Sequence, residues 1–348
     1  MNSSDGGSKP RFPLRLERWF HGKRVQRAKK RGKVATVIPF YSYGSNRWIR
    51  ILGRTLLLHA ESPEHQHHSS AGHPLTRVRG WRSFTSVHAA DESIEIFANG
   101  QLVATTKTDS GGVLDAVVNV DLPTGWHTVE LKTAHNSTKA VVRIIDNSTP
   151  IGIICDVDDT ILNTALPRPF VAAWNSFVAN ENARLATPGM PVLMDHLSAS
   201  NPGAPVIYVS TGAWNVAPVL TRFLKRHLYP AGPFLLTDWG PTHDRWFRSG
   251  SEHKRRELRR IISEFPNTRW VLIGDDGQLD EEIYHEFSSE FPDHIAAVAI
   301  RQLSTGEAVL AGGRSKAQQH RAVSGVPWVY GPDGAVLRQQ LKELGLIR

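Results

Sequence analysis

Residues Ile151–Thr164 read IGIICDVDDTILNT, and this stretch decides the fold expected for the second half of the chain. The apolar run IGIIC leads directly into Asp156, Asp158 and Asp159. A short apolar run of this kind is consistent with a buried strand. In sheets of parallel strands, ligands bind at the carboxyl ends of the strands. We therefore expect Asp156 and Asp158 to face a crevice at the end of a central strand.

The sequence after residue 150 alternates between apolar runs typical of strands and amphipathic runs typical of helices. The predicted strands cover residues 151–155, 205–210, 232–236, 269–276 and 294–301. The predicted helices cover residues 169–185, 190–200, 214–228, 253–265, 279–291 and 333–347. Repeated units of this kind build a parallel sheet with helices on both faces. The fold class expected for residues 150–348 is therefore α/β.

Residues 34–149 contain short β-branched and aromatic runs separated by turn residues. The strongest local signal is Asn99-Gly100 between two alternating runs, which predicts a tight hairpin. An earlier pair of runs is broken at Gly44 and Ser45. Short strands at this spacing are typical of a sandwich or barrel. The predicted division is a segment at 1–33, a small all-β sandwich-like domain at 34–149 and an α/β domain at 150–348.

The composition of the 348 residues is that of a folded protein with room for two cores. The single cysteine, Cys155, lies inside an apolar run and is expected to be a buried small side chain rather than a reactive thiol. No apolar run is long enough for a membrane-spanning helix, and no secretory signal is expected. These features favour a cytoplasmic location. The histidine-rich residues 59–74 are interpreted as a surface loop, with a metal site as the alternative.

The net charge of +8 is concentrated near the N-terminus. Residues 11–33 hold ten Lys or Arg and one Glu, so the rest of the chain is close to neutral. A segment of this kind suits an anionic surface, and its apolar residues, including Trp19 and Phe20, favour a membrane interface. The alternative is a solvated tail or a helix packed on the body. Nucleic acid is not expected as a partner.

A second acidic cluster follows another predicted strand. The run VLIGDDGQLD places Asp275 and Asp276 at the strand end and Asp280 at the start of a helix. Clustered carboxylates repel one another, and a divalent cation removes that repulsion. Oxygen ligands in a site that handles phosphate point to Mg²⁺. For any one acidic motif alone, a turn or a helix cap is an equal alternative.

Two further motifs complete the set of candidate site residues. Ser210, Thr211 and Gly212 come at the end of the predicted strand in VIYVSTG, where a hydroxyl beside a flexible turn would suit a phosphate oxygen. Lys254 is predicted near the start of a helix, after a turn at Gly250-Ser251. A surface lysine is the alternative for this position taken alone.

The four motifs in this order resemble the haloacid dehalogenase (HAD) phosphatase superfamily. The first motif, DxDx[TV], stands here as DVDDT, beginning at Asp156. More narrowly, DVDDTI, YVSTGAWN, LIGDDGQLDEEIY, IAAVAIR and GVPWVYG resemble the catalytic domain of the actin-patch phosphatidate phosphatase family, over about residues 150–348. The stretch YSYG with ILGRTLL is similar to the β-rich region of its bacterial members. STGAW and TDWG depart from the pattern of the lipid phosphatases, which leaves the substrate open.

The resemblance implies an uncapped HAD-like Rossmannoid fold and a role for each motif. Asp156 would be the nucleophile, Asp158 the general acid and base, and Ser210 and Lys254 the groups that hold the phosphoryl oxygens. Mg²⁺ would be held by Asp156, the Asp158 carbonyl and Asp275, supported by Asp276 or Asp280. The choice between Asp276 and Asp280 as the supporting ligand stays open.

The expected function is a Mg²⁺-dependent phosphomonoester hydrolase that forms an aspartyl-phosphate and resembles phosphatidate phosphatases. One alternative is a HAD phosphatase for a soluble or macromolecular phosphate, such as a protein or a nucleic-acid end. Another is a non-catalytic β-sandwich binding protein. The expected partners are a phosphorylated substrate and an anionic lipid surface, with peripheral membrane association. The oligomeric state stays open.

Overall fold

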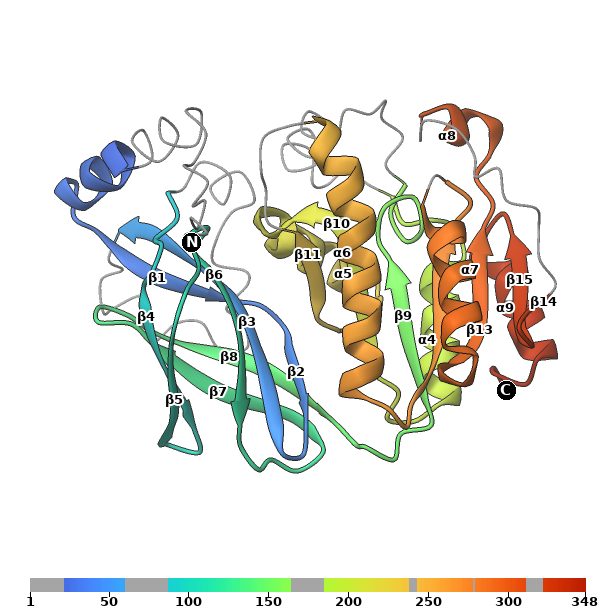
Figure 1. Cartoon of the computed structure of the whole chain (residues 1–348), viewed down its shortest axis with the longest axis horizontal. Coiled ribbons are helices and arrows are strands. Elements are labelled where there is room, and N and C mark those ends of the chain that lie inside the picture. The colour runs from blue at the N-terminus through green and yellow to red at the C-terminus, as the bar shows by residue number, and fades with distance from the viewer. Residues whose placement is uncertain (1–21, 60–86, 164–184, 238–242, 278, 311–321) are drawn as a thin grey trace, which may run out of the picture.

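The computed structural model describes residues 22–59, 87–163, 185–237, 243–277, 279–310 and 322–348. Two sheets lie side by side in the described part of the chain (Figure 1). The first is built from residues 33–145, and the second, called the parallel sheet below, from residues 151–331.

The first sheet has eight strands in the order β1-β3-β2-β8-β7-β4-β5, with β6 paired to β3. All its ladders are antiparallel except that between β2 and β8. Its strands are β1 (Lys33–Pro39), β2 (Ser42–Ser45), β3 (Trp48–His59), β4 (Ser93–Ala98), β5 (Gln101–Lys107), β6 (Val113–Asn119), β7 (Gly125–Lys132) and β8 (Ser137–Ile145). Alternating side chains from these strands enclose an apolar core that includes Ile49, Ile96, Val129 and Val142.

The predicted hairpin at Asn99-Gly100 is confirmed, because it joins β4 to β5 with φ values of 50° and 78°. The predicted break at Gly44 and Ser45 is wrong, because both residues belong to β2. A Cβ on Gly44 would lie 2.2 Å from the Trp48 carbonyl oxygen, so glycine here allows two strands to approach closely. The division into domains at residue 150 and the sandwich class stay predictions.

The parallel sheet has the strand order β11-β10-β9-β12-β13-β15-β14. All its neighbours run parallel except β14 and β15, which form a hairpin. Its strands are β9 (Ile151–Asp156), β10 (Val206–Ala213), β11 (Phe234–Thr237), β12 (Arg269–Asp275), β13 (Ile295–Arg301), β14 (Ala322–Val323) and β15 (Val326–Gly331). The strands are almost continuously apolar because both faces are covered. Cys155 is fully buried in β9, as predicted.

Helices cover both faces of the parallel sheet. In Figure 1, α6 and α7 lie in front of it and α4 lies behind. The helices are α4 (Met190–Ser200), α5 (Ala217–Arg226), α6 (His243–Glu264), α7 (Asp280–Glu290), α8 (Thr305–Leu310) and α9 (Gly334–Glu343), with 3₁₀ turns η4 (Trp214–Val216) and η5 (Pro292–His294). The expectation of an α/β fold with a parallel sheet is confirmed. Its assignment to the HAD-like Rossmannoid class stays a proposal.

Several elements differ from the sequence prediction, were not predicted, or fall outside the described residues. Helix α6 begins at His243, so the turn predicted at Gly250-Ser251 is wrong and Lys254 lies in the middle of the helix. A Cβ on Gly250 would lie 3.1 Å from Thr211 Cγ2, so this glycine serves close packing of the helix. Helix α8 and the hairpin of β14 and β15 were not predicted. The helix predicted at 169–185 and the histidine-rich loop at 59–74 lie almost wholly outside the described residues.

The first sheet packs directly against the parallel sheet and α6. The rings of Phe40 and Trp214 stack with centroids 5.2 Å apart. The Tyr43 hydroxyl donates to Glu264 over 2.7 Å, and Arg50 Nη1 donates to the same carboxylate over 3.0 Å. Both the aromatic pair and the charged group are largely buried, so the apolar core is continuous across the junction.

Part of the basic N-terminal segment forms a helix at residues 22–30. Its Val25 and Ala28 pack against Ala35, Leu57 and Ala89 of the first sheet. Its cationic side chains point outward and are exposed. For residues 22–30, the structure therefore agrees with the alternative given above, a helix packed on the body of the protein.

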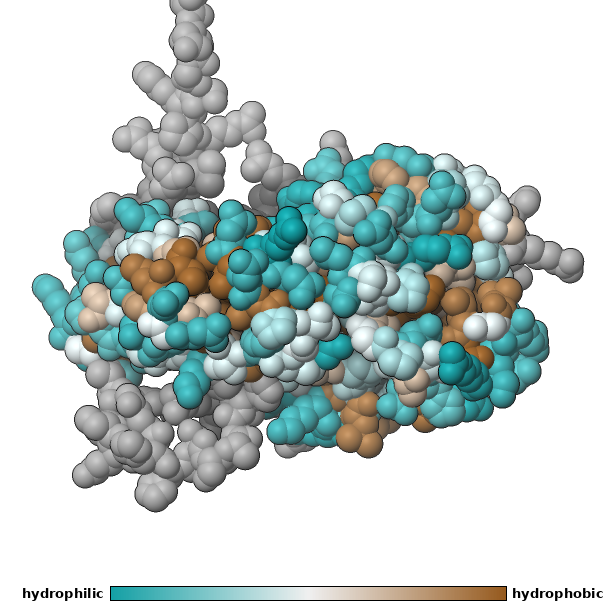
Figure 2. Space-filling model, turned by 90° about the horizontal axis from the view of Figure 1, so that it is seen from below, coloured by the Kyte–Doolittle hydropathy of each residue, from teal (hydrophilic) through white to brown (hydrophobic). Residues whose placement is uncertain are grey.

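The described helices include none that is long and apolar enough to cross a bilayer. Figure 2 views the molecule from below and has a largely hydrophilic surface broken by separate hydrophobic patches. The exposed apolar side chains in the described ranges include Leu102, Val117 and Trp126 of the first sheet.

Candidate active site

The candidate site lies at the carboxyl ends of three adjacent strands. Strand β9 is paired to β10 on one side and to β12 on the other, and Asp156 lies opposite Val209, the residue before Ser210. The chain builds β10 and β11 on one side of β9 before it crosses to β12 on the other. Such a reversal opens a crevice at the strand ends, which is where α/β folds bind their ligands.

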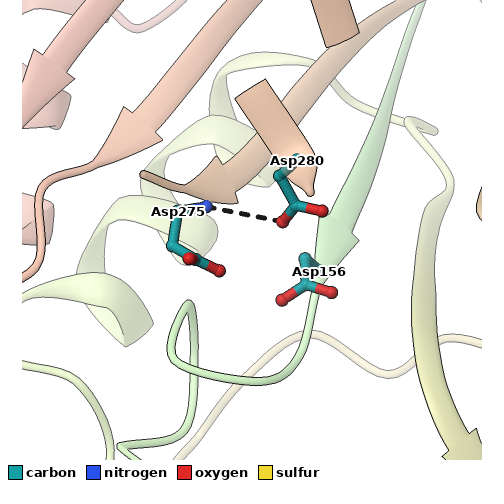
Figure 3. Close-up of side chains that lie close together, drawn as sticks. All are labelled: Asp156, Asp275 and Asp280. Carbon is teal, nitrogen blue, oxygen red and sulfur yellow. Dashed lines mark hydrogen bonds between the residues drawn. The ribbon is translucent and has the colours of Figure 1, made fainter. Parts of the chain in front are cut away.

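Three carboxylates converge in this crevice. Asp156 ends β9, Asp275 ends β12 and Asp280 begins α7, and their ligand oxygens lie within 4.8 Å of one another. Figure 3 shows Asp280 directed toward the other two, with its Oδ2 3.5 Å from the Asp275 backbone nitrogen. Gly274 makes room for this arrangement, since a Cβ there would lie 2.6 Å from Asp280 Oδ2.

Lys254 is the cation that balances this acidic cluster. It lies on α6 and is only 6% exposed. Its Nζ donates to Asp156 Oδ1 over 2.6 Å and also contacts Asp280 Oδ1. The structure thus brings Lys254 into the site, as the sequence predicted, although from a different position in its helix.

Burial controls the ionisation of the acidic cluster. Desolvation, followed by the charge of Asp280, raises the pKa of Asp156 well above its usual range, and Lys254 offsets only part of this effect. The same two causes raise the pKa of Asp275 from 3.8 to about 8. Burial lowers the pKa of Lys254, but the attraction of Asp156 and Asp280 outweighs it and the net pKa is raised. The site therefore favours additional positive charge.

Asp158 lies on the side of the crevice formed by β10. Its Oδ2 accepts a hydrogen bond of 2.9 Å from the Ser210 hydroxyl, whose oxygen accepts one of 2.9 Å from the Gly212 N–H. The backbone oxygens of Thr211 and Gly212 accept from the Thr237 hydroxyl, which ties the end of β10 to the end of β11. The turn predicted at Ser210, Thr211 and Gly212 is wrong, because β10 continues through these residues to Ala213, with a register shift against β11. The structure nevertheless brings Asp158 together with this end of β10, which was predicted to bind a phosphate.

Asp276 and Asp280, which the sequence left as alternatives, have different surroundings. Asp276 Oδ1 accepts a 2.8 Å bond from the Leu303 N–H, and Asp276 is not among the three grouped carboxylates. Asp280 is in that group. As the supporting metal ligand we therefore favour Asp280 over Asp276, and this assignment stays a proposal.

The residues present fit a divalent cation. All candidate ligand atoms in the group are carboxylate oxygens, which hard cations such as Mg²⁺, Mn²⁺ and Ca²⁺ prefer. When Asp156, Asp275 and Asp280 are all ionised, Lys254 neutralises one of their charges and leaves two. A divalent cation matches that remainder, and clustered buried carboxylates have little other means of staying ionised.

Sequence reasoning missed two polar residues that support the site. The Thr160 hydroxyl donates to Asp275 Oδ2 over 3.3 Å, and Arg301 reaches the loop after β9. Thr160 is the last residue of the DxDx[TV] motif, so its position was available as a signal. Arg301 follows the apolar run IAAVAI, and a charged residue at the end of a buried strand was the only hint.

We predict that the metal-free protein loses stability as the pH rises from about 4 to 8. In this window the folded state holds a proton on Asp275 that the unfolded chain has released, so the unfolding free energy must fall as pH rises. The slope expected is on the order of 1 kcal/mol per pH unit for each such group. Urea unfolding in EDTA at several pH values measures it.

The Asp275→Asn variant is the control for this pH dependence, because it removes one of the two carboxyl groups with a raised pKa and should make the slope smaller. Saturating Mg²⁺ should restore stability at pH 8 in the wild-type protein, since it favours the ionised carboxylates. Stability in EDTA that rises with pH across the same window would contradict the prediction.

Residues 151–302 match the family described as "Phosphatidate phosphatase APP1, catalytic domain". The matched residues include every candidate site residue named above. This part of the chain resembles that phosphatase family.

Two curated proteins are similar over the same part of the chain. "Phosphatidate phosphatase APP1" of Saccharomyces cerevisiae is 26% identical over 152 residues, which cover 43% of this chain and 26% of that protein. An uncharacterized protein of Schizosaccharomyces pombe is 28% identical over 156 residues, which cover 44% of this chain and 25% of that protein. The chain thus spans about a quarter of the length of the curated relatives that it matches.

Among solved structures, a carbohydrate acetylesterase from Xanthomonas citri covers 71% of this chain and 70% of its own, with 10% identity and a TM-score of 0.22. A likeness at that level supports no conclusion about fold or function.

Proposed function

We propose that this chain is a Mg²⁺-dependent phosphomonoester hydrolase of the HAD type, and that it acts on a phosphatidate-like lipid. The observation that carries the proposal is the convergence of Asp156, Asp275 and Asp280 at the carboxyl ends of adjacent parallel strands, where Lys254 pairs with Asp156 and Asp280. The match to a phosphatidate phosphatase catalytic domain supports the same chemistry. The resemblance to a lipid phosphatase favours a lipid over the alternative of a soluble or macromolecular phosphate.

In the proposed reaction, an oxygen of Asp156 attacks phosphorus and the ester bond breaks. Asp158 donates a proton to the leaving oxygen and later removes one from the water that hydrolyses the aspartyl-phosphate. Ser210 orients the Asp158 carboxylate, as their hydrogen bond allows. Lys254 and the end of β10 at Thr211 and Gly212 would hold the phosphoryl oxygens. Asp156, Asp275 and Asp280 would hold Mg²⁺, which supplies positive charge against the phosphoryl oxygens.

The experiment that tests this proposal is a hydrolysis screen with purified protein. The panel should hold phosphatidate in vesicles, other phosphorylated lipids, phosphopeptides, phosphorylated nucleic-acid ends and small phosphomonoesters, each with Mg²⁺ and with EDTA. Mg²⁺-dependent release of phosphate from phosphatidate is the expected result. Preference for a soluble or macromolecular phosphate would favour the alternative, and no hydrolysis of any member would favour a non-catalytic binding protein.

We predict that Asp158→Asn lowers turnover by about 10²–10⁴-fold, the usual contribution of general acid–base catalysis. The amide keeps the shape of the side chain and can still pair with Ser210, so the fold should be unchanged. Steady-state kinetics against pH, together with a thermal melt, measures both effects. A wild-type rate and pH profile in this variant would assign the acid–base role to another residue.

The proposed partner is an anionic membrane surface on the cytoplasmic side, with peripheral association through the basic N-terminal segment. The helix at residues 22–30 packs on the first sheet through Val25 and Ala28, which leaves its cations facing outward. Residues 22–33 contain no acidic side chain. Such a helix would present a fixed positive surface to acidic lipid.

We predict that replacing Arg24, Arg27 and Lys30 by Glu lowers partitioning onto phosphatidate-containing vesicles by at least ~100-fold at low salt, since each basic residue near an anionic surface contributes about 1 kcal/mol. Co-sedimentation at low and high salt measures this. Hydrolysis of a small phosphomonoester should not change. The matched control replaces three exposed lysines elsewhere, Lys139, Lys225 and Lys342, by Glu. Equal binding by wild type and the Arg24, Arg27 and Lys30 variant would remove the membrane proposal.

A further inference from the structure

Arg301 is a buried cation that the proposed mechanism does not use. It is the last residue of β13 and is 4% exposed. Arginine is seldom buried to this extent unless it is paired. Its Nη1 donates to the backbone oxygen of Asp159 over 2.5 Å, and its Nη2 donates to Glu307 over 2.6 Å.

The carbonyl that Arg301 binds belongs to a residue with an unusual backbone. Asp159 has a φ of 58°, in the left-handed region that few non-glycine residues adopt. The chain reverses here, directly after Asp156 and Asp158, and the Asp159 N–H donates to the Leu162 oxygen over 2.9 Å. A guanidinium bonded to the Asp159 carbonyl stabilises the orientation of that peptide.

Arg301 also contacts the second acidic loop through its backbone. Its carbonyl oxygen accepts a 2.9 Å hydrogen bond from the N–H of Asp276, the residue after Asp275. Its partner Glu307 accepts a further bond of 2.8 Å from Asn163, which lies just beyond the reversal. One residue therefore connects the loop that carries the proposed nucleophile with the loop that carries a proposed metal ligand.

We propose that Arg301 is a positioning residue, which sets the first acidic loop against the second so that Asp156, Asp158 and Asp275 share one site. The proposal rests on the proposed phosphatase function. Arg301 acts through the Asp159 carbonyl and has no role in contacting substrate. The planar guanidinium suits this role because it directs two N–H groups at two acceptors, whereas a lysine would reach only one of them with a fixed direction.

The test compares Arg301→Met with wild type in two measurements. The first is kcat and KM for a small phosphomonoester at saturating Mg²⁺, and the second is the affinity for Mn²⁺ alone, followed by electron paramagnetic resonance. Residues that orient metal ligands typically contribute about 10–100-fold to affinity or activity. We expect Arg301→Met to lower kcat and Mn²⁺ affinity within that range and to leave KM close to the wild-type value.

Arg269→Met is the matched control. Its guanidinium also donates to a backbone oxygen, that of Ile295 over 3.0 Å, but at the opposite end of β12. This variant should keep the wild-type kcat and Mn²⁺ affinity. Arg301→Lys should recover part of what Arg301→Met loses, because it keeps the charge and one hydrogen bond.

Two results would overturn the proposal. One is a folded Arg301→Met protein with wild-type kcat and Mn²⁺ affinity. The other is a loss of activity in Arg301→Met that matches its loss of folded protein, so that kcat and Mn²⁺ affinity per folded molecule equal those of wild type.

If Arg301→Met does not fold, Glu307→Gln is the deciding variant. It removes the charge that orients Arg301 Nη2, and it should lower both kcat and Mn²⁺ affinity. If the wild type hydrolyses no phosphate, the proposed function fails, whereas Mn²⁺ affinity still decides the role of Arg301.

Discussion

Replacing Asp156 by Asn should lower turnover by at least about 10⁴-fold, because the amide cannot act as the nucleophile and is a poorer metal ligand. The fold should persist, since Lys254 keeps its contact with Asp280. Acid quench with a ³²P-labelled substrate should trap phosphate on the wild-type protein and none on the variant. Turnover and trapping together separate loss of the nucleophile from loss of substrate binding.

The matched control for this experiment is Asp195→Asn on the exposed side of α4, which should behave as wild type in both assays. Undiminished turnover by purified Asp156→Asn would end the mechanism proposed here. Labelled phosphate that is trapped on the variant would assign the nucleophile to a different residue.

Replacing Lys254 by Met should produce the largest combined effect on activity and stability. The loss of a group that stabilises charge in the transition state typically costs about 10²–10³-fold in turnover. Removing one partner of a buried ion pair typically costs about 3–5 kcal/mol, because it leaves the other charge uncompensated. Here two carboxylates, Asp156 and Asp280, lose their cation.

The stability effect of Lys254→Met should depend on metal. In EDTA the carboxylates have no cation, so urea unfolding should show the full loss. Saturating Mg²⁺ should recover a large part of it, since the ion supplies the missing positive charge. Lys225→Met on the exposed end of α5 is the control and should leave the unfolding free energy unchanged. An unfolding free energy for Lys254→Met in EDTA equal to that of wild type would contradict the role of Lys254 as the charge that balances the site.

Local sequence patterns were sufficient to place most elements of the parallel sheet and its helices. The apolar runs that became β9, β10, β12 and β13 were each identified from length and composition. The turn at Asn99-Gly100 was also identified, because type I′ geometry requires residues that tolerate positive φ. Local patterns failed at Gly44 and Gly250, where the glycine serves a close approach within an element rather than a break.

The sequence by itself determined which residue types stand at the strand ends, and so the candidates Asp156, Asp158, Ser210 and Asp275. Their chemistry follows from a short stretch of chain, since an apolar strand that ends in carboxylates is recognisable without knowledge of its neighbours. Only the tertiary structure decided how these residues combine.

Strand order places β9 between β10 and β12, and that order depends on pairings between segments more than 50 residues apart in the chain. The same long-range packing turns Asp280 toward Asp156 and Asp276 toward Leu303, although both acids stand in one local motif. It also brings Arg301 to the Asp159 carbonyl, 142 residues away in sequence. Contacts of this kind depend on the packing of whole elements, and no local pattern encodes the distance between them.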